Sequence, residues 1–101
     1  MNSQELIKKL ESKKEHYQSR YGFSEIFLFG SYAENNANAD SDIDIAVTVD
    51  SGFKTYKNFI AAKEELSQDL FNKEIDLVYF NSINLNPIIK DEIERKRIRI
   101  G

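Results

Sequence analysis

The stretch that decides the fold is Phe29-Gly-Ser-Tyr-Ala-Glu-Asn-Asn-Ala-Asn-Ala-Asp-Ser-Asp-Ile-Asp-Ile45. An apolar run enters it and ends at Gly30-Ser31, and an alternating apolar run begins around Asp42 and Asp44. The segment between them is rich in asparagine and alanine, which is typical of a loop. Side chains two residues apart on a strand share a face, so both aspartates are predicted to point the same way. A glycine-serine turn beside paired carboxylates predicts a phosphate cradle next to a metal site.

The rest of the chain supplies helices and strands around this stretch. Three segments show the helical period of apolar residues: 2–21, 55–71 and 88–95. Three short apolar or alternating runs predict strands: 25–29, 42–49 and 74–80. One helical turn is expected at 32–36, and the basic tail, 95–101, is expected to form a short edge strand or to fray. In the second helix, the side chains expected to face inward are Tyr56, Phe59, Ile60, Leu66 and Leu70.

The connections predict how the strands pair. Ten residues lie between Ser31 and Asp42, which is short for the crossover that a parallel pair needs, so the first two strands are predicted to be antiparallel. A helix joins the second strand to the third, which favours a parallel, right-handed connection. The predicted fold class is therefore α/β (α+β), with a mixed three-stranded sheet in the order 1-2-3 and helices packed on it. Residues 1–101 are predicted to form one domain.

This pairing brings four polar residues to one edge of the sheet: Ser31, Asp42, Asp44 and Asp76. The apolar residues of the second and third strands alternate with the aspartates, so the three carboxylates are predicted to share the face away from the core. Clustered carboxylates repel one another unless a cation lies among them, and oxygen ligands suit Mg²⁺ or Mn²⁺. Two ions at such a site favour phosphoryl or nucleotidyl transfer.

Composition narrows the function classes. The chain has 101 residues, 41% of them hydrophobic, which predicts a compact globular protein. Its 14 basic and 17 acidic residues give a net charge of −3, so a nucleic-acid partner is not expected. No cysteine is present, and neither a signal-like apolar segment nor a membrane-length run occurs, so a cytoplasmic location without membrane association is expected. The lone histidine, His16, is interpreted as a surface or boundary residue.

The spacing of Gly30-Ser31, Asp42-Ile-Asp44 and Asp76 resembles the nucleotidyltransferase superfamily of DNA polymerase beta and kanamycin nucleotidyltransferase. The short chain resembles the minimal nucleotidyltransferases, the MntA-type antitoxins found beside HEPN-domain toxins. The resemblance covers essentially the whole chain.

The resemblance implies a role for each residue of the motif. Asp42 and Asp44 would bind two Mg²⁺ ions, or Mn²⁺, and Asp76 would bind the catalytic ion and help deprotonate the acceptor. Gly30 and Ser31 would hold the β- and γ-phosphates of ATP. The implied reaction transfers AMP to a hydroxyl and releases pyrophosphate, and in toxin–antitoxin pairs the acceptor is a tyrosine of the HEPN toxin.

The chain departs from the family pattern at one place. Many minimal members read Gly-Ser-x-Ala-Arg-Gly, whereas this chain has Glu34 and Asn35 at the last two positions. An acidic residue replaces a basic one near the phosphates, which predicts weaker nucleotide binding. Asn35 can still adopt a left-handed turn.

Three functions stay open from sequence. The leading one is an adenylyltransferase that silences a partner toxin, because little of the chain lies outside the catalytic core to grip an acceptor. The others are a nucleotidyltransferase acting on a small molecule such as an aminoglycoside, and a non-catalytic antitoxin that neutralises by binding. A homo-oligomer is also left open, and so is a role of the basic tail in contacting a partner.

Overall fold

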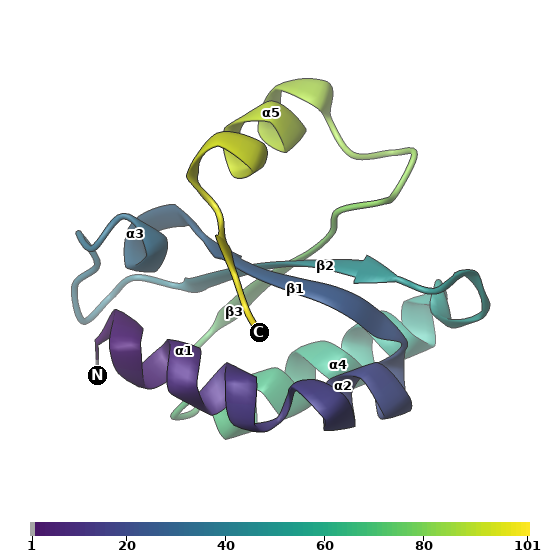
Figure 1. The fold of residues 1–101 in the computed structure, drawn as a ribbon, viewed down its shortest axis with the longest axis horizontal. Helices are drawn as coiled ribbons and strands as arrows, with labels where there is room; N and C mark the ends of the chain where they lie inside the picture. The colour runs from purple at the N-terminus through teal and green to yellow at the C-terminus, as the bar shows by residue number, and fades with distance from the viewer. Residues whose placement is uncertain (1) are drawn as a thin grey trace.

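The computed structural model describes residues 2–101, which form a four-stranded sheet with helices on both faces (Figure 1). The helices are α1 (Ser3–Ser12), α2 (Lys14–Tyr21), α3 (Gly30–Ala33), α4 (Tyr56–Asp69) and α5 (Pro87–Lys96), with a 3-10 turn, η1, over Ser51–Phe53. The strands are β1 (Phe23–Phe29), β2 (Ile43–Val49), β3 (Ile75–Tyr79) and β4 (Ile98–Arg99). No helix in this part of the chain is long and apolar enough to cross a membrane.

The sheet confirms the predicted pairing and adds one strand. β1 and β2 are antiparallel, β2 and β3 are parallel, and the order is β3-β2-β1-β4. The prediction of three strands was therefore one short. The extra strand is the basic tail, which pairs antiparallel with β1 because Leu28 and Phe27 offer a free edge opposite Ile98 and Arg99. The amide of Ile100 extends this pairing by donating to the carbonyl of Ile26 over 2.9 Å.

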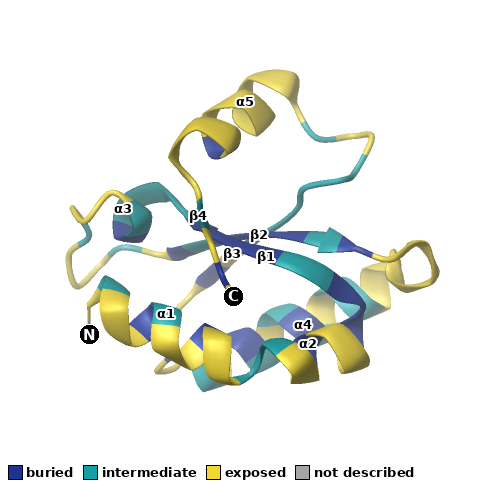
Figure 2. Ribbon diagram, viewed as in Figure 1, coloured by how far each residue is buried: buried dark blue, intermediate teal, exposed yellow. Residues whose placement is uncertain are grey.

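Two apolar layers hold the sheet. Alternation sends Ile43, Ile45 and Val47 to one face, where α1, α2 and α4 cover them (Figure 1). The opposite face carries a smaller cluster around Phe27 and Ile93, under α5. Figure 2 shows the difference: α5 is exposed along most of its length, whereas α1, α2 and α4 each bury a stripe of residues. Asp44 and Asp76, which alternate with the buried residues of β2 and β3, lie on the α5 face.

The first helix is broken, which corrects the prediction of one helix over 2–21. The chain kinks at Lys13, whose amide bonds to Leu10 in an i→i+3 contact. The kink lets the ammonium of Lys13 reach Glu65 (3.2 Å) and Asp69 (2.5 Å) on α4. The predicted apolar stripe survives the break: Leu6, Leu10, Tyr17 and Tyr21 are all buried.

Glu65 ties α2 to α4, and its loss is expected to destabilise the fold. It accepts hydrogen bonds from Tyr21 (2.7 Å), His16 (2.5 Å) and Lys13. Partial burial alone would raise the pKa of Glu65, but these donors outweigh burial and hold the pKa below its ordinary value. A lowered carboxyl pKa stabilises the fold above the unfolded pKa, and that contribution is lost as the pH falls through the folded value.

We therefore expect Glu65→Gln to lower the free energy of unfolding by about 1 kcal/mol at pH 7, as measured by urea denaturation. The deficit relative to wild type should shrink as the pH falls below about 4, because the carboxyl is then protonated in the unfolded chain and, at still lower pH, in the folded protein too. The matched control is Glu64→Gln, which changes an exposed neighbour on the same helix. An equal loss of unfolding free energy in the two variants would show that the hydrogen bonds to Glu65 do not stabilise the fold.

Two further predictions need correction. The helical turn after β1 begins at Gly30 instead of Tyr32, because Gly30 adopts φ 70° and turns the chain as soon as the strand ends. Tyr56 and Ile60 do not face the core, and their exposed fractions are 75% and 43%. His16 lies at the boundary as predicted, with 45% of its side chain exposed.

Candidate active site

Strand register places two of the predicted carboxylates side by side. Asp44, the second residue of β2, pairs with Asp76 on β3 and with Phe29 at the end of β1. Asp42 immediately precedes β2 and is exposed. Apolar alternation fixes this arrangement. Ile43 and Ile75 are buried on the face that α1, α2 and α4 cover, so the aspartates that alternate with them point to the opposite face.

The carboxyl groups of Asp44 and Asp76 are in direct contact. Burial, the hydrogen bond to Asp76 and the charges of Asp76 and Asp42 together raise the pKa of Asp44 to about 6, with burial the largest cause. Two carboxylates this close ionise together at a cost, so the pair either shares a proton or attracts a cation. Within residues 2–101, no three acidic or histidine side chains are already gathered as a metal site. Asp42 would have to turn inward to complete one.

Gly30 closes the site on the β1 side. With φ 70°, it lies so close to Asp44 that an added Cβ would overlap the Oδ2 of that carboxylate and lie 2.7 Å from its Cγ. Only glycine combines this φ with so close an approach. Ser31 follows in the first turn of α3, where backbone N–H groups lack intrahelical acceptors and can face an anion. Asn35, at the end of this segment, has φ 62°, which confirms the expected left-handed turn.

A pocket of about 130 Å³ lies over Gly30 and Asp44, between α3 and α5. Its other polar lining residues are Glu34, Glu92 and Lys96. The structure therefore groups Gly30, Asp44 and Asp76, with Asp42 and Ser31 next to them in the chain.

Sequence reasoning missed the contribution of α5. The basic tail was the one available signal, but nothing in it indicated which residue faces the site.

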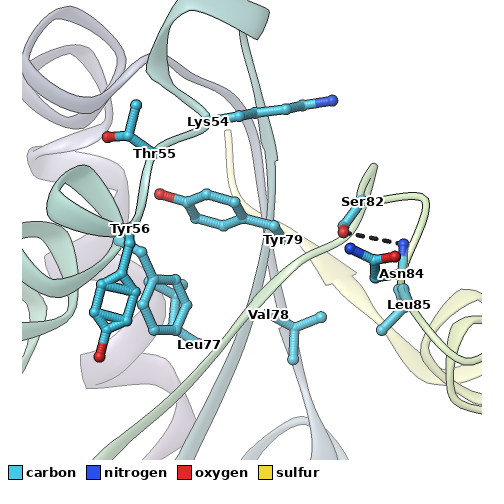
Figure 3. Close-up of a pocket in the computed structure, with 10 residues that line it drawn as sticks. Lys54, Thr55, Tyr56, Leu77, Val78, Tyr79, Ser82, Asn84 and Leu85 are labelled. Carbon is cyan, nitrogen blue, oxygen red and sulfur yellow. Dashed lines mark hydrogen bonds between the residues drawn. The ribbon is translucent and has the colours of Figure 1, made fainter.

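A larger groove of about 560 Å³ lies beside the free edge of β3. Figure 3 shows the ring of Tyr79 pointing from β3 toward Thr55 and Tyr56, with Ser82 and Leu85 across the groove. Leu77 and Val78 also line it, directly after Asp76 in the strand. Neither Asp44 nor Asp76 lines this groove, so it is a separate feature of the β3 edge.

Comparisons with known proteins agree with this geometry. The nucleotidyltransferase domain family matches residues 5–100. MJ0435 of Methanocaldococcus jannaschii, named as a candidate protein adenylyltransferase, is 35% identical over 81 residues, covering 80% of this chain and 83% of the relative. The protein adenylyltransferase MntA of Thermococcus cleftensis is 35% identical over 74 residues, 73% of each chain.

Solved structures show the same fold. A candidate minimal nucleotidyltransferase superimposes with a TM-score of 0.79 at 26% identity, covering 97% of this chain and 95% of its own. A toxin–antitoxin structure with AMP-PNP has a TM-score of 0.65 at 22% identity. The match covers 90% of this chain and 72% of the matched chain. The protein therefore belongs to the nucleotidyltransferase domain family, in its MntA-type minimal branch, and is a nucleotidyltransferase.

Proposed function

We propose that this protein acts in the cytoplasm as an antitoxin that transfers AMP from ATP to a tyrosine hydroxyl of a partner HEPN-domain toxin. The observation that carries the proposal is the contact between Asp44 and Asp76, with Gly30 against Asp44. The names of the relatives support a protein acceptor, and the toxin–antitoxin neighbour with AMP-PNP supports ATP as donor and a toxin as partner.

The chain's own residues suit this chemistry. Asp76 is exposed and pairs with Asp44 across the two strands, so it can accept the proton of an incoming hydroxyl. The acceptor oxygen then forms a bond to the α-phosphorus as the bond to the leaving pyrophosphate breaks. Gly30 and Ser31 would hold the outer phosphates, because the chain there offers N–H groups and no side chain at Gly30 to obstruct an anion.

The carboxylates also fit a divalent metal. Asp44 and Asp76 crowd two negative charges together, and the raised pKa of Asp44 shows that the cost of ionising it is not offset by the protein alone. Oxygen-only ligands of this kind suit Mg²⁺, and Mn²⁺ as a substitute. Two bound ions would neutralise the carboxylates and the phosphate charge that develops during transfer. Asp42, Asp44 and Asp76 are the residues that would hold them.

A protein acceptor fits the surface around the site. Large apolar side chains are exposed near the groove, including Ile83 (99%), Ile88 (78%) and Tyr56 (75%). Exposed apolar residues gathered around a groove are typical of a protein-binding surface more than of a site for a polar, cationic drug. The net charge of −3 gives no support for nucleic acid as the acceptor.

The proposal is tested by mixing the purified protein with its genomic neighbour, ATP and Mg²⁺, and weighing the neighbour by mass spectrometry. We expect a gain of one or more AMP masses, and none when ATP is replaced by α,β-methylene-ATP, whose bridge between the α- and β-phosphates cannot be cleaved. A folded, toxic neighbour that gains no mass would contradict the proposal. Neutralisation by binding alone is separated by combining Asp42→Ala with Asp44→Ala: toxin neutralisation that survives both changes would show that catalysis is not the means.

A further inference from the structure

The pocket over Gly30 and Asp44 has an unusual charge pattern for a site that accepts polyphosphate. Three carboxylates line it: Glu34, Asp44 and Glu92. A nucleotide triphosphate is itself strongly anionic, so phosphates placed beside Gly30 would meet repulsion from several directions. Among the described residues that line the pocket, Lys96 is the one cation. Its position therefore bears directly on nucleotide binding.

Lys96 is held at the pocket by a specific contact. Its ammonium donates to Oε1 of Glu34 over 3.0 Å, joining the last turn of α5 to the residue that follows α3. The side chains are 50% and 36% exposed, and ion pairs this exposed contribute little to stability. The main consequence of the pair is positional, because it fixes a positive charge a few residues from Gly30.

The helix that carries Lys96 is itself fixed to the sheet. Ile93, one turn earlier, is buried among Phe27 and Ala46. The guanidinium of Arg97, the next residue, lies 4.2 Å from the centre of the Phe27 ring. Contacts on both sides of Lys96 thus orient the end of α5, where Lys96 lines the same pocket as Gly30.

We infer that Lys96 is a nucleotide-binding residue that contacts the triphosphate of the donor, an assignment that rests on the proposed function. An ammonium has three N–H donors, so Lys96 can keep its bond to Glu34 while donating to a phosphate oxygen. The cation comes from the C-terminal helix, 62 residues from Glu34 in sequence. Glu34 does not abolish the positive charge of the pocket but holds it in place.

The test is calorimetric binding of AMP-PNP with Mg²⁺ to the purified full chain, without any acceptor. Lys96→Gln is expected to weaken binding about tenfold, as expected for one lost charge-assisted hydrogen bond, and Lys96→Arg to retain most of it. The matched control is Arg95→Gln, which removes an equal charge from the same helix and breaks the exposed pair with Asp91. It should leave binding unchanged, and all three variants should melt within a few degrees of wild type.

The outcomes separate this inference from the proposed function. If wild type binds AMP-PNP and Lys96→Gln binds it as tightly as Arg95→Gln, the assignment of Lys96 is wrong and the proposed function is untouched. If Lys96→Gln weakens binding but the partner never gains AMP, the acceptor proposal fails and Lys96 remains a nucleotide ligand. A wild-type chain that binds no nucleotide would overturn both.

Discussion

Asp44→Asn should make the protein inactive and, above pH 6, more stable. Transfer of AMP is expected to fall by a factor on the order of 10³, because the substitution removes a carboxylate from the centre of the site. Stability should rise because burial and the neighbouring Asp76 make ionised Asp44 unfavourable in the folded protein, as its raised pKa of about 6 indicates. An amide of the same shape carries no charge and relieves this repulsion.

The pH dependence of the stability follows from the direction of the pKa shift of Asp44, which is upward. A raised carboxyl pKa means that the unfolded chain releases the proton more readily, so wild type loses stability as pH rises from about 4 to about 6. We expect Asp44→Asn to be about 1–2 kcal/mol more stable than wild type at pH 8 in EDTA, a figure reduced for solvent screening of this half-buried group. The advantage should vanish near pH 4. Urea denaturation at both pH values measures it.

Two controls sharpen this prediction. Asp40→Asn makes the same charge change at an exposed residue of the loop before β2 and should alter neither activity nor stability. Adding Mg²⁺ should raise the melting temperature of wild type but not that of Asp44→Asn, since binding to the folded state stabilises it. Asp44→Asn less stable than wild type at pH 8 in EDTA would show that the Asp44–Asp76 contact is favourable without metal, contrary to this account.

Gly30→Ala should damage both the fold and the site. The residue has φ 70°, where an alanine costs roughly 1–2 kcal/mol, and its new Cβ would overlap the carboxylate of Asp44. Asp44 has a short side chain and belongs to β2. Its carboxylate can avoid the overlap only by rotating away from Gly30, and this rotation alters its contact with Asp76. We expect a loss of about 2–3 kcal/mol of unfolding free energy and at least a tenfold loss of AMP transfer.

A double-mutant cycle separates the two causes. In the background of Asp44→Ala, the two atoms that overlap most, Oδ2 and Cγ, are gone and only the Cβ of residue 44 remains, at 3.1 Å, so Gly30→Ala should cost little more than the backbone part of its effect. Gly52→Ala is the control for the substitution itself, since a Cβ there would meet nothing within 4 Å. The same cost for Gly30→Ala in both backgrounds would mean that the close approach to Asp44 is not what requires glycine.

Much of the sheet was predictable because apolar alternation leaves few choices. One register places Ile43 and Ile45 in the core beside Ile75, and the same register pairs Asp44 with Asp76. Short connections then fix strand direction. The kink at Lys13 was not predictable, because it leaves the apolar period unchanged and the contacts that accompany it are with acidic residues more than 50 positions away, on α4.

The departure at Glu34 shows most clearly where sequence reasoning stopped. Taken alone, an acidic residue near the phosphates predicts weakened nucleotide binding. The structure brings Lys96 to the same place, so the local charge differs from what the residues around Glu34 indicate. Nothing in the period of α5 shows which of its basic residues faces the pocket, since Arg95, Lys96 and Arg97 are consecutive and point in different directions.

Because the two apolar layers differ in size, we expect α5 to detach at a lower temperature than the one at which the rest of the protein unfolds. The layer under α1, α2 and α4 is extensive, whereas the α5 face has three fully buried members, Phe27, Ala46 and Ile93. Detachment of α5 would open the pocket over Gly30 and Asp44 while leaving the larger layer, and most of the spectroscopic helix signal, intact. A melting curve will therefore overstate the temperature up to which the protein works, and assays of this family should follow ligand binding as well as folding.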